Sequence, residues 1–171
     1  RWVAQDIRYV SIALGIGGYQ PRTPAEVLST GFGDCKDKAT LFVAAARKYG
    51  IDADPVLLSL SAPPDRATPS IYQFNHAIAA VRTGKSWTFT DLTAESIPYG
   101  ELPGAYQGNF GVVVLPDGRA EEVTFPASPP DSNPSSLRMV SELKADGSLV
   151  ATVAGRCLGV LPLSNPQAVY A

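Results

Sequence analysis

The chain has 171 residues, a formal net charge of −2 and a sequence pI near 5.3. Its 45% hydrophobic and 18% charged residues are typical of a globular protein with at least one good core. Lysine and arginine are scattered without forming a basic run, which argues against nucleic acid or an anionic membrane surface as a partner. No apolar stretch approaches the ~18 residues needed to span a bilayer, so we expect no membrane insertion.

The first thirty residues predict short elements. Apolar side chains at helical spacing in residues 2–10 predict the end of a helix, which runs into strand-like residues 9–14. The glycines of residues 15–18 predict a turn, and they do not form a dinucleotide-binding loop because no strand–helix unit surrounds them. Thr23 and Pro24 then predict the capped start of a short helix.

A longer helix is predicted directly after Gly33. Asp34 is a suitable N-cap, apolar residues supply one buried face, and Gly50 is a natural left-handed stop. The helix therefore has about four turns. Cys35 lies in its first turn.

The rest of the chain predicts strands joined by turns. A loop rich in proline occupies residues 62–69, and residues 126–136 form a Pro/Ser-rich linker. The predicted strands are residues 53–60, 74–82, 86–93, 110–115, 121–125, 137–143 and 148–154. We therefore expect an α+β domain over residues 1–125 and a partial β domain over residues 137–171. Because the chain opens with Arg1 and not Met, we expect flanking domains of a longer protein.

Cys35 is the candidate nucleophile. Backbone N–H groups and the helix dipole at a helix start stabilise a thiolate. One alternative is an inert buried cysteine, since free cysteine is among the most buried residue types. A disulfide to Cys157 is a second alternative. A zinc site is weaker still, because one histidine and two distant cysteines lack the spacing of zinc ligands.

The only histidine, His76, and Asp91 lie in two successive predicted strands. A two-residue turn at Thr83 and Gly84 places Asp91 directly opposite His76, because both are equally far from the turn. A three-residue turn with a bulge would instead place Thr90 opposite His76. The apolar residues that would share their face, and form its floor, are Ile78, Ala80, Trp87 and Phe89.

Each of these residues also has a purely structural interpretation. His76 could be a hydrogen-bonded core histidine, and Asp91 a solvated acid at a strand end. However, His76 and Asp91 are expected to lie on the same face of the sheet, beside the cysteine at the helix start. This arrangement favours catalysis, since a histidine can take the thiol proton and a carboxylate can orient the imidazole.

Four short runs carry a family resemblance. They are Ile7-Arg8-Tyr9, the run Gly33-Asp34-Cys35-Lys36-Asp37-Lys38-Ala39, Asn75-His76-Ala77 and Asp91-Leu92-Thr93. In order and spacing these runs resemble the transglutaminase-like superfamily, within the papain-like cysteine enzymes. With the preceding GIGGYQP, the pattern GDCKDKA is most similar to the bacterial branch that carries a DUF3857 β domain before its transglutaminase-like domain.

The resemblance implies a Cys–His–Asp triad at Cys35, His76 and Asp91. It also implies an α+β core in which the cysteine helix packs on an antiparallel sheet, and an exported parent protein, periplasmic or extracellular. The chain departs from papain at the oxyanion site, because Ser29 stands where papain has a glutamine. The backbone N–H of Cys35 is then the first expected donor, and the weak candidates for the second are Gln20, Tyr19 and Trp2.

The expected function is thiol acyl transfer on amide bonds of a protein or peptide substrate. A thioester on the cysteine would be resolved by an amine or by water, so transglutaminase, deamidase and cysteine protease all stay open. No metal or other cofactor is needed for this chemistry. The alternative is a non-catalytic binding module that keeps the fold as a scaffold.

Overall fold

The computed structural model describes residues 1–11, 14–129, 131 and 134–157. In chain order the helices (α, or η for 3-10) and strands are α1 (Trp2–Gln5), β1 (Arg8–Tyr9), η1 (Gly15–Gly18), α2 (Pro24–Thr30), β2 (Phe32–Gly33), α3 (Cys35–Lys48), β3 (Ala53–Leu58), η2 (Ile71–Gln73), β4 (His76–Thr83), β5 (Ser86–Thr90), β6 (Phe110–Val114), β7 (Ala120–Thr124), β8 (Ser135–Leu143) and β9 (Leu149–Cys157). These elements fall into two compact units, residues 1–127 and 128–171.

The first unit is built on a curled antiparallel sheet in the order β5-β4-β3-β6-β7. Although β5 and β7 are the outer strands, Glu121 of β7 accepts hydrogen bonds from Trp87 Nε1 of β5 at 2.9 Å and from Arg82 Nη2 of β4 at 3.3 Å. Phe89 and Phe125 also meet edge to face, with ring centroids 5.0 Å apart. These contacts hold the two edges near each other. The α+β architecture expected from the sequence is confirmed.

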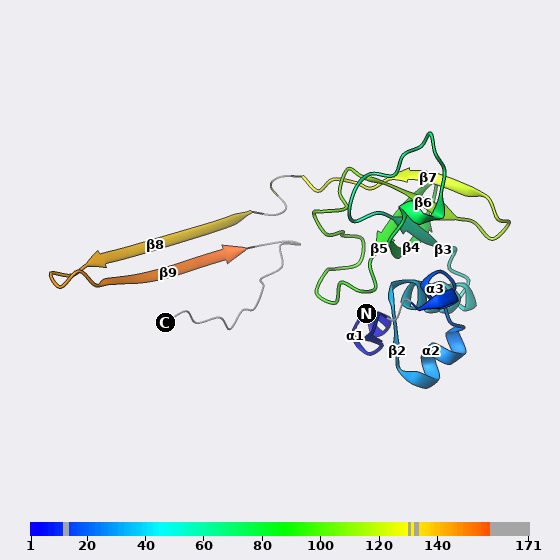
Figure 1. Cartoon of the computed structure of the whole chain (residues 1–171), viewed down its shortest axis with the longest axis horizontal. Helices are drawn as coiled ribbons and strands as arrows, with labels where there is room; N and C mark the ends of the chain where they lie inside the picture. Colours follow the sequence, from blue (N-terminus) through cyan, green and yellow to red (C-terminus); the bar gives the residue numbers. More distant parts are fainter. Residues whose placement is uncertain (12–13, 130, 132–133, 158–171) are drawn as a thin grey trace. The chain divides into compact units, whose positions relative to one another are not determined.

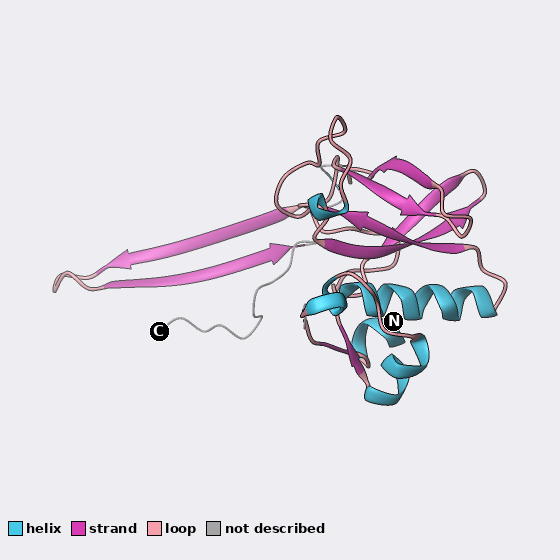
Figure 2. Ribbon diagram, turned by 45° about the vertical axis from the view of Figure 1, so that its right-hand side comes forward, coloured by secondary structure: helices cyan, strands magenta, loops and turns pink. Residues whose placement is uncertain are grey.

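Two apolar clusters cover the two faces of the sheet. Figure 2 shows α3 running along one face, and Figure 1 shows α1, α2 and β2 gathered around that helix. The cluster on the helix side contains Val3, Ile7, Val27, Leu41, Val43, Ala46, Ala53, Ala79 and Leu92. The cluster on the other face contains Val56, Leu58, Ile78, Ala80, Phe89, Leu102, Tyr106, Val113 and Phe125. The second cluster includes residues of the connection between β5 and β6, which therefore closes this face.

The helix that carries Cys35 has the bounds that its sequence predicts. Asp34 caps α3 by accepting a hydrogen bond from the Asp37 N–H at 3.2 Å, and the Asp37 carboxylate accepts the Asp34 N–H at 3.1 Å. This reciprocal pair satisfies two N–H groups that a helix start otherwise leaves open. Gly50 follows the helix with a φ of 74°, as expected for a left-handed stop.

The register predicted for the β4–β5 hairpin is wrong. The structure pairs Thr83 with Ser86, so the turn consists of Gly84 and Lys85 and not of Thr83 and Gly84. Gly84 has a φ of 63°, and the first position of a primed hairpin turn favours glycine for this reason. The shift makes Asp91 a diagonal neighbour of His76. Because a one-residue move of the turn shifts the pairing by two positions, both residues stay on the same face.

The start of the chain also differs from expectation. The helix ends at Gln5, and the strand β1 has only two residues, which pair in parallel with β2. Part of the predicted strand, residues 12–13, lies outside the described residues. The β1–β2 pairing joins segments more than twenty residues apart in the chain, so no local pattern could predict it. It brings Tyr9 beside Gly33.

The second unit contains the antiparallel hairpin β8–β9. Every side chain of the hairpin over residues 135–156 is exposed. The apolar residues Leu137, Met139, Ala151, Val153, Leu143 and Leu149 share one face of this hairpin. A two-stranded hairpin with an uncovered apolar face is marginally stable at best in water.

We expect limited proteolysis of the chain to cut first between Phe125 and Leu137. A linker of this composition is a preferred site of cleavage, and the cut should release a resistant N-terminal fragment because the first unit has a packed core. Mass spectrometry of the first fragments checks this. Persistent protection of the segment would mean that the C-terminal strands complete the same core, and would contradict the predicted linker.

Candidate active site

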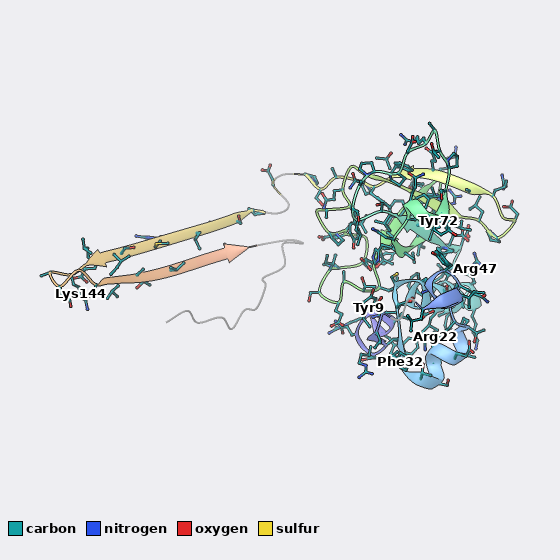
Figure 3. All side chains as sticks on the ribbon, viewed as in Figure 1. Tyr9, Arg22, Phe32, Arg47, Tyr72 and Lys144 are labelled. Carbon is teal, nitrogen blue, oxygen red and sulfur yellow. The ribbon has the colours of Figure 1, made fainter. Side chains whose placement is uncertain are left out.

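Local hydrogen bonds position Cys35 at the start of α3. Arg22 donates its backbone N–H to Asp37 Oδ1 at 2.7 Å and its Nη2 to Asp37 Oδ2 at 3.0 Å. The Arg22 guanidinium also stacks over Phe32, 4.6 Å from the ring centroid, and Figure 3 labels both side chains. A Cβ at Gly33 would lie 2.7 Å from the Asp37 Cβ, so glycine is required there.

His76 and Asp91 form a buried pair. His76 begins β4 and Asp91 directly follows β5. Their side chains are 7% and 1% exposed, and His76 Nε2 lies 3.0 Å from Asp91 Oδ2. Thr93 holds the other carboxylate oxygen, since its N–H and hydroxyl reach Asp91 Oδ1 at 2.8 and 2.7 Å.

Each residue of this pair stabilises the charged form of the other. Burial acts to raise the pKa of Asp91, but the bonds from His76 and Thr93 hold it below its ordinary value. Asp91 is therefore ionised, and His76 must donate its Nε2–H to it. The Nδ1 atom is left for a second partner.

Cys35 lies beside His76 and is the candidate for this second partner. Burial acts to lower the pKa of His76, but hydrogen bonds and charge from Asp91 and then Cys35 raise it to about 9. Cys35 and His76 line one pocket of about 190 Å³, with Tyr9 and Tyr19 among its other walls. Cys35 is a free, partly buried thiol in the structure.

We expect the raised pKa of His76 to make stability depend on pH. The unfolded pKa is near 6.5 and the folded pKa about 9, so the stabilising contribution is complete below pH 6.5 and is lost as the pH rises through 9. Its full size is about 3 kcal/mol. Urea unfolding at a series of pH values checks this, with His76→Gln as the control that should lack the alkaline loss. Parallel curves for both proteins would contradict it.

The three weak oxyanion candidates occupy different places. Tyr19 lines the pocket of Cys35, and Gln20 lines a neighbouring pocket of about 280 Å³ that also touches Asp34. Trp2 lies in α1 with 48% of its surface exposed, and is not among the residues that line the Cys35 pocket. The first-turn N–H groups of α3, including that of Cys35, have no partner within the helix.

Sequence reasoning missed several residues of this site. Thr93 could have been found, since a threonine two positions after an aspartate commonly bonds the carboxylate in an Asx-type turn. Tyr106, whose hydroxyl reaches Asp91 Oδ2 at 2.8 Å, lies in a segment without a motif. Lys38 is fully buried, donates Nζ to the Ala4 carbonyl at 3.0 Å, and interacts with the charge of Asp91.

The described part of the chain holds neither a metal cluster nor a membrane-spanning helix. Among the residues that the structure describes, no three or more His, Cys, Asp or Glu side chains gather as a metal site would require. In the same part of the chain, no helix has the length and apolar character to cross a membrane.

A cysteine at a helix start, packed on an antiparallel sheet beside a His–Asp pair, agrees with a papain-like cysteine-enzyme fold. A family model described as the transglutaminase-like superfamily matches residues 1–92, which include Cys35, His76 and Asp91. The chain therefore belongs to the transglutaminase-like superfamily, which generally includes cysteine enzymes. No curated protein and no solved structure matches the chain at a significant level.

Proposed function

We propose that this chain is a thiol acyl-transfer enzyme that acts on amide bonds of a protein or peptide. Cys35 is the nucleophile, His76 is the base and then the acid, and Asp91 orients the imidazole. The observation that carries the proposal is the buried 3.0 Å bond between His76 Nε2 and Asp91 Oδ2, which leaves Nδ1 for Cys35 in the shared pocket.

The proposed reaction has two halves. Because the pKa of His76 is about 9, His76 Nδ1 already holds a proton at neutral pH, so Cys35 Sγ attacks the amide carbonyl carbon as the thiolate and a C–S bond forms. The tetrahedral intermediate collapses when the C–N bond breaks, and His76 returns the proton to the leaving amine. An amine or water then attacks the thioester with His76 as base, which releases the acyl product and restores the thiol.

The Cys35 backbone N–H is the proposed first donor to the oxyanion. It is supported by its place in the first turn of α3, where no intrahelical acceptor exists. Of the three side chains considered for the second donor, Tyr19 is favoured over Gln20 and Trp2 because it lines the same pocket as Cys35.

The choice between amine and water depends on access to the thioester. Tyr19 and Tyr72 meet edge to face with ring centroids 5.5 Å apart, and they come from segments far apart in the chain. Tyr72 is held in a loop that Gln73 stabilises by hydrogen bonds to the backbone of Asp65 and Thr68. Tyr19 and Tyr72 are 58% and 76% exposed, and Tyr72 is not among the residues that line the Cys35 pocket, so this pair does not shield the thioester from water and both acceptors stay open.

The test is mass spectrometry of a glutamine-containing protein incubated with the chain, with and without a primary amine. Addition of the amine at glutamine supports transglutamination, conversion of glutamine to glutamate supports deamidation, and backbone cleavage supports proteolysis. If no product forms and Cys35 reacts with iodoacetamide no faster than a free thiol, the chain is a non-catalytic binding module instead.

We also propose that the parent protein is exported and carries flanking domains, in the branch with a DUF3857 domain. The GIGGYQP and GDCKDKA runs support this assignment. Detection of the full-length protein in the periplasm or the medium of the source cells would test it.

A further inference from the structure

The Asp91 carboxylate has four donors, and one of them comes from well beyond the segment that matches the family. Oδ1 accepts both bonds from Thr93, whereas Oδ2 accepts His76 Nε2–H and the Tyr106 hydroxyl at 2.8 Å. Tyr106 follows the family match, which ends at residue 92. Two donors therefore share the one oxygen that bonds the imidazole.

The surrounding structure holds Tyr106 in this position. It is 8% exposed and belongs to the apolar cluster on the face opposite α3. Its N–H donates to the Pro103 carbonyl at 2.9 Å, and its own carbonyl accepts the Asn109 N–H at 3.0 Å. The Tyr106 and His76 rings have their centroids 5.8 Å apart and are tilted by 54°.

We propose that Tyr106 is a positioning residue of the proposed active site, whose hydroxyl shares Asp91 Oδ2 with His76 and thereby sets how strongly the carboxylate attracts the imidazolium. The inference rests on the proposed function. Thr93 alone already anchors Oδ1, so removal of the phenol hydroxyl leaves Asp91 in place. Oδ2 then has His76 as its single remaining donor and attracts the imidazolium more strongly.

The phenol can act at any physiological pH. Burial, followed by the charge of Asp91 and the bond to it, raises the pKa of Tyr106 well above its ordinary value of 10.0, so it stays a neutral donor. The titratable groups that interact with Asp91 or His76 are Cys35, Lys38, Tyr9 and Tyr106. Of these four, only Tyr106 has a hydrogen bond to the Asp91 carboxylate among the described residues.

The test is an NMR titration of His76, the only histidine, in the whole chain and in Tyr106→Phe. We expect the pKa of His76 to rise in Tyr106→Phe by roughly half a unit to one unit, because Oδ2 loses its second donor. Turnover should fall by at most about three- to tenfold, since an imidazolium with a higher pKa is a weaker acid toward the leaving amine. Tyr99→Phe, at an exposed tyrosine of the same connection, is the matched control and should change neither quantity.

A double-mutant cycle separates positioning from packing. In the Asp91→Asn background, Tyr106→Phe should no longer raise the pKa of His76, because the shared carboxylate is gone. An unchanged or lowered pKa in the single variant, or an equal rise in both backgrounds, would overturn the proposal. If the wild-type chain shows no acyl transfer but the titration behaves as expected, the proposed function fails while the role of Tyr106 toward His76 stands.

Discussion

Cys35→Ala is expected to abolish acyl transfer while leaving the fold intact. No serine or threonine lies in the first turn of α3, so no neighbouring hydroxyl can replace the thiol. Cys35 is only partly buried, and its loss removes a single sulfur from the wall of a pocket and not from the core. Turnover in the mass-spectrometric assay and thermal unfolding followed by circular dichroism check the two halves of this expectation.

Cys157→Ala is the matched control, since it removes the other cysteine of the chain. It should keep full turnover. In the Cys157→Ala background, Cys35 is the remaining cysteine that iodoacetamide can label. Adding His76→Gln to this background should slow the labelling, because the imidazolium that stabilises the thiolate is lost. Residual turnover in Cys35→Ala, or loss of turnover in Cys157→Ala, would show that Cys35 is not the nucleophile.

Asp91→Asn is expected to lower turnover by about 10²-fold or more without unfolding the chain. The oxygen of the new carboxamide would keep the two bonds from Thr93, which turns the amide NH₂ toward His76. An amide that donates to Nε2 forces the neutral imidazole to carry its proton on Nδ1, so that it can no longer accept the proton of Cys35.

The same substitution should lower the pKa of His76 from about 9 toward or below 6.5, because burial then acts without the carboxylate. Kinetics and NMR titration of one protein sample measure both effects. Asp52→Asn, at an exposed aspartate, is the control and should leave both unchanged. Full turnover in Asp91→Asn would show that Asp91 has a structural role and no role in the reaction.

Local sequence patterns determine much of this protein. The N-cap at Asp34 and the left-handed stop at Gly50 bound the Cys35 helix, because capping depends on residues within one turn of each other. Strand alternation likewise predicts that His76 and Asp91 share one face. That prediction holds although the turn lies one residue further along, because the pairing then moves by an even number of positions.

Only the tertiary structure decided the remainder, since it depends on contacts between distant segments. The two-residue pairing of β1 with β2 brings Tyr9 toward Cys35, and the curled sheet brings Glu121 to Trp87. The long connection after β5 turns Tyr106 back onto Asp91. No period or spacing in the sequence predicts the contact between Tyr106 and Asp91, because this contact depends on how the connection packs against the face of the sheet that it covers.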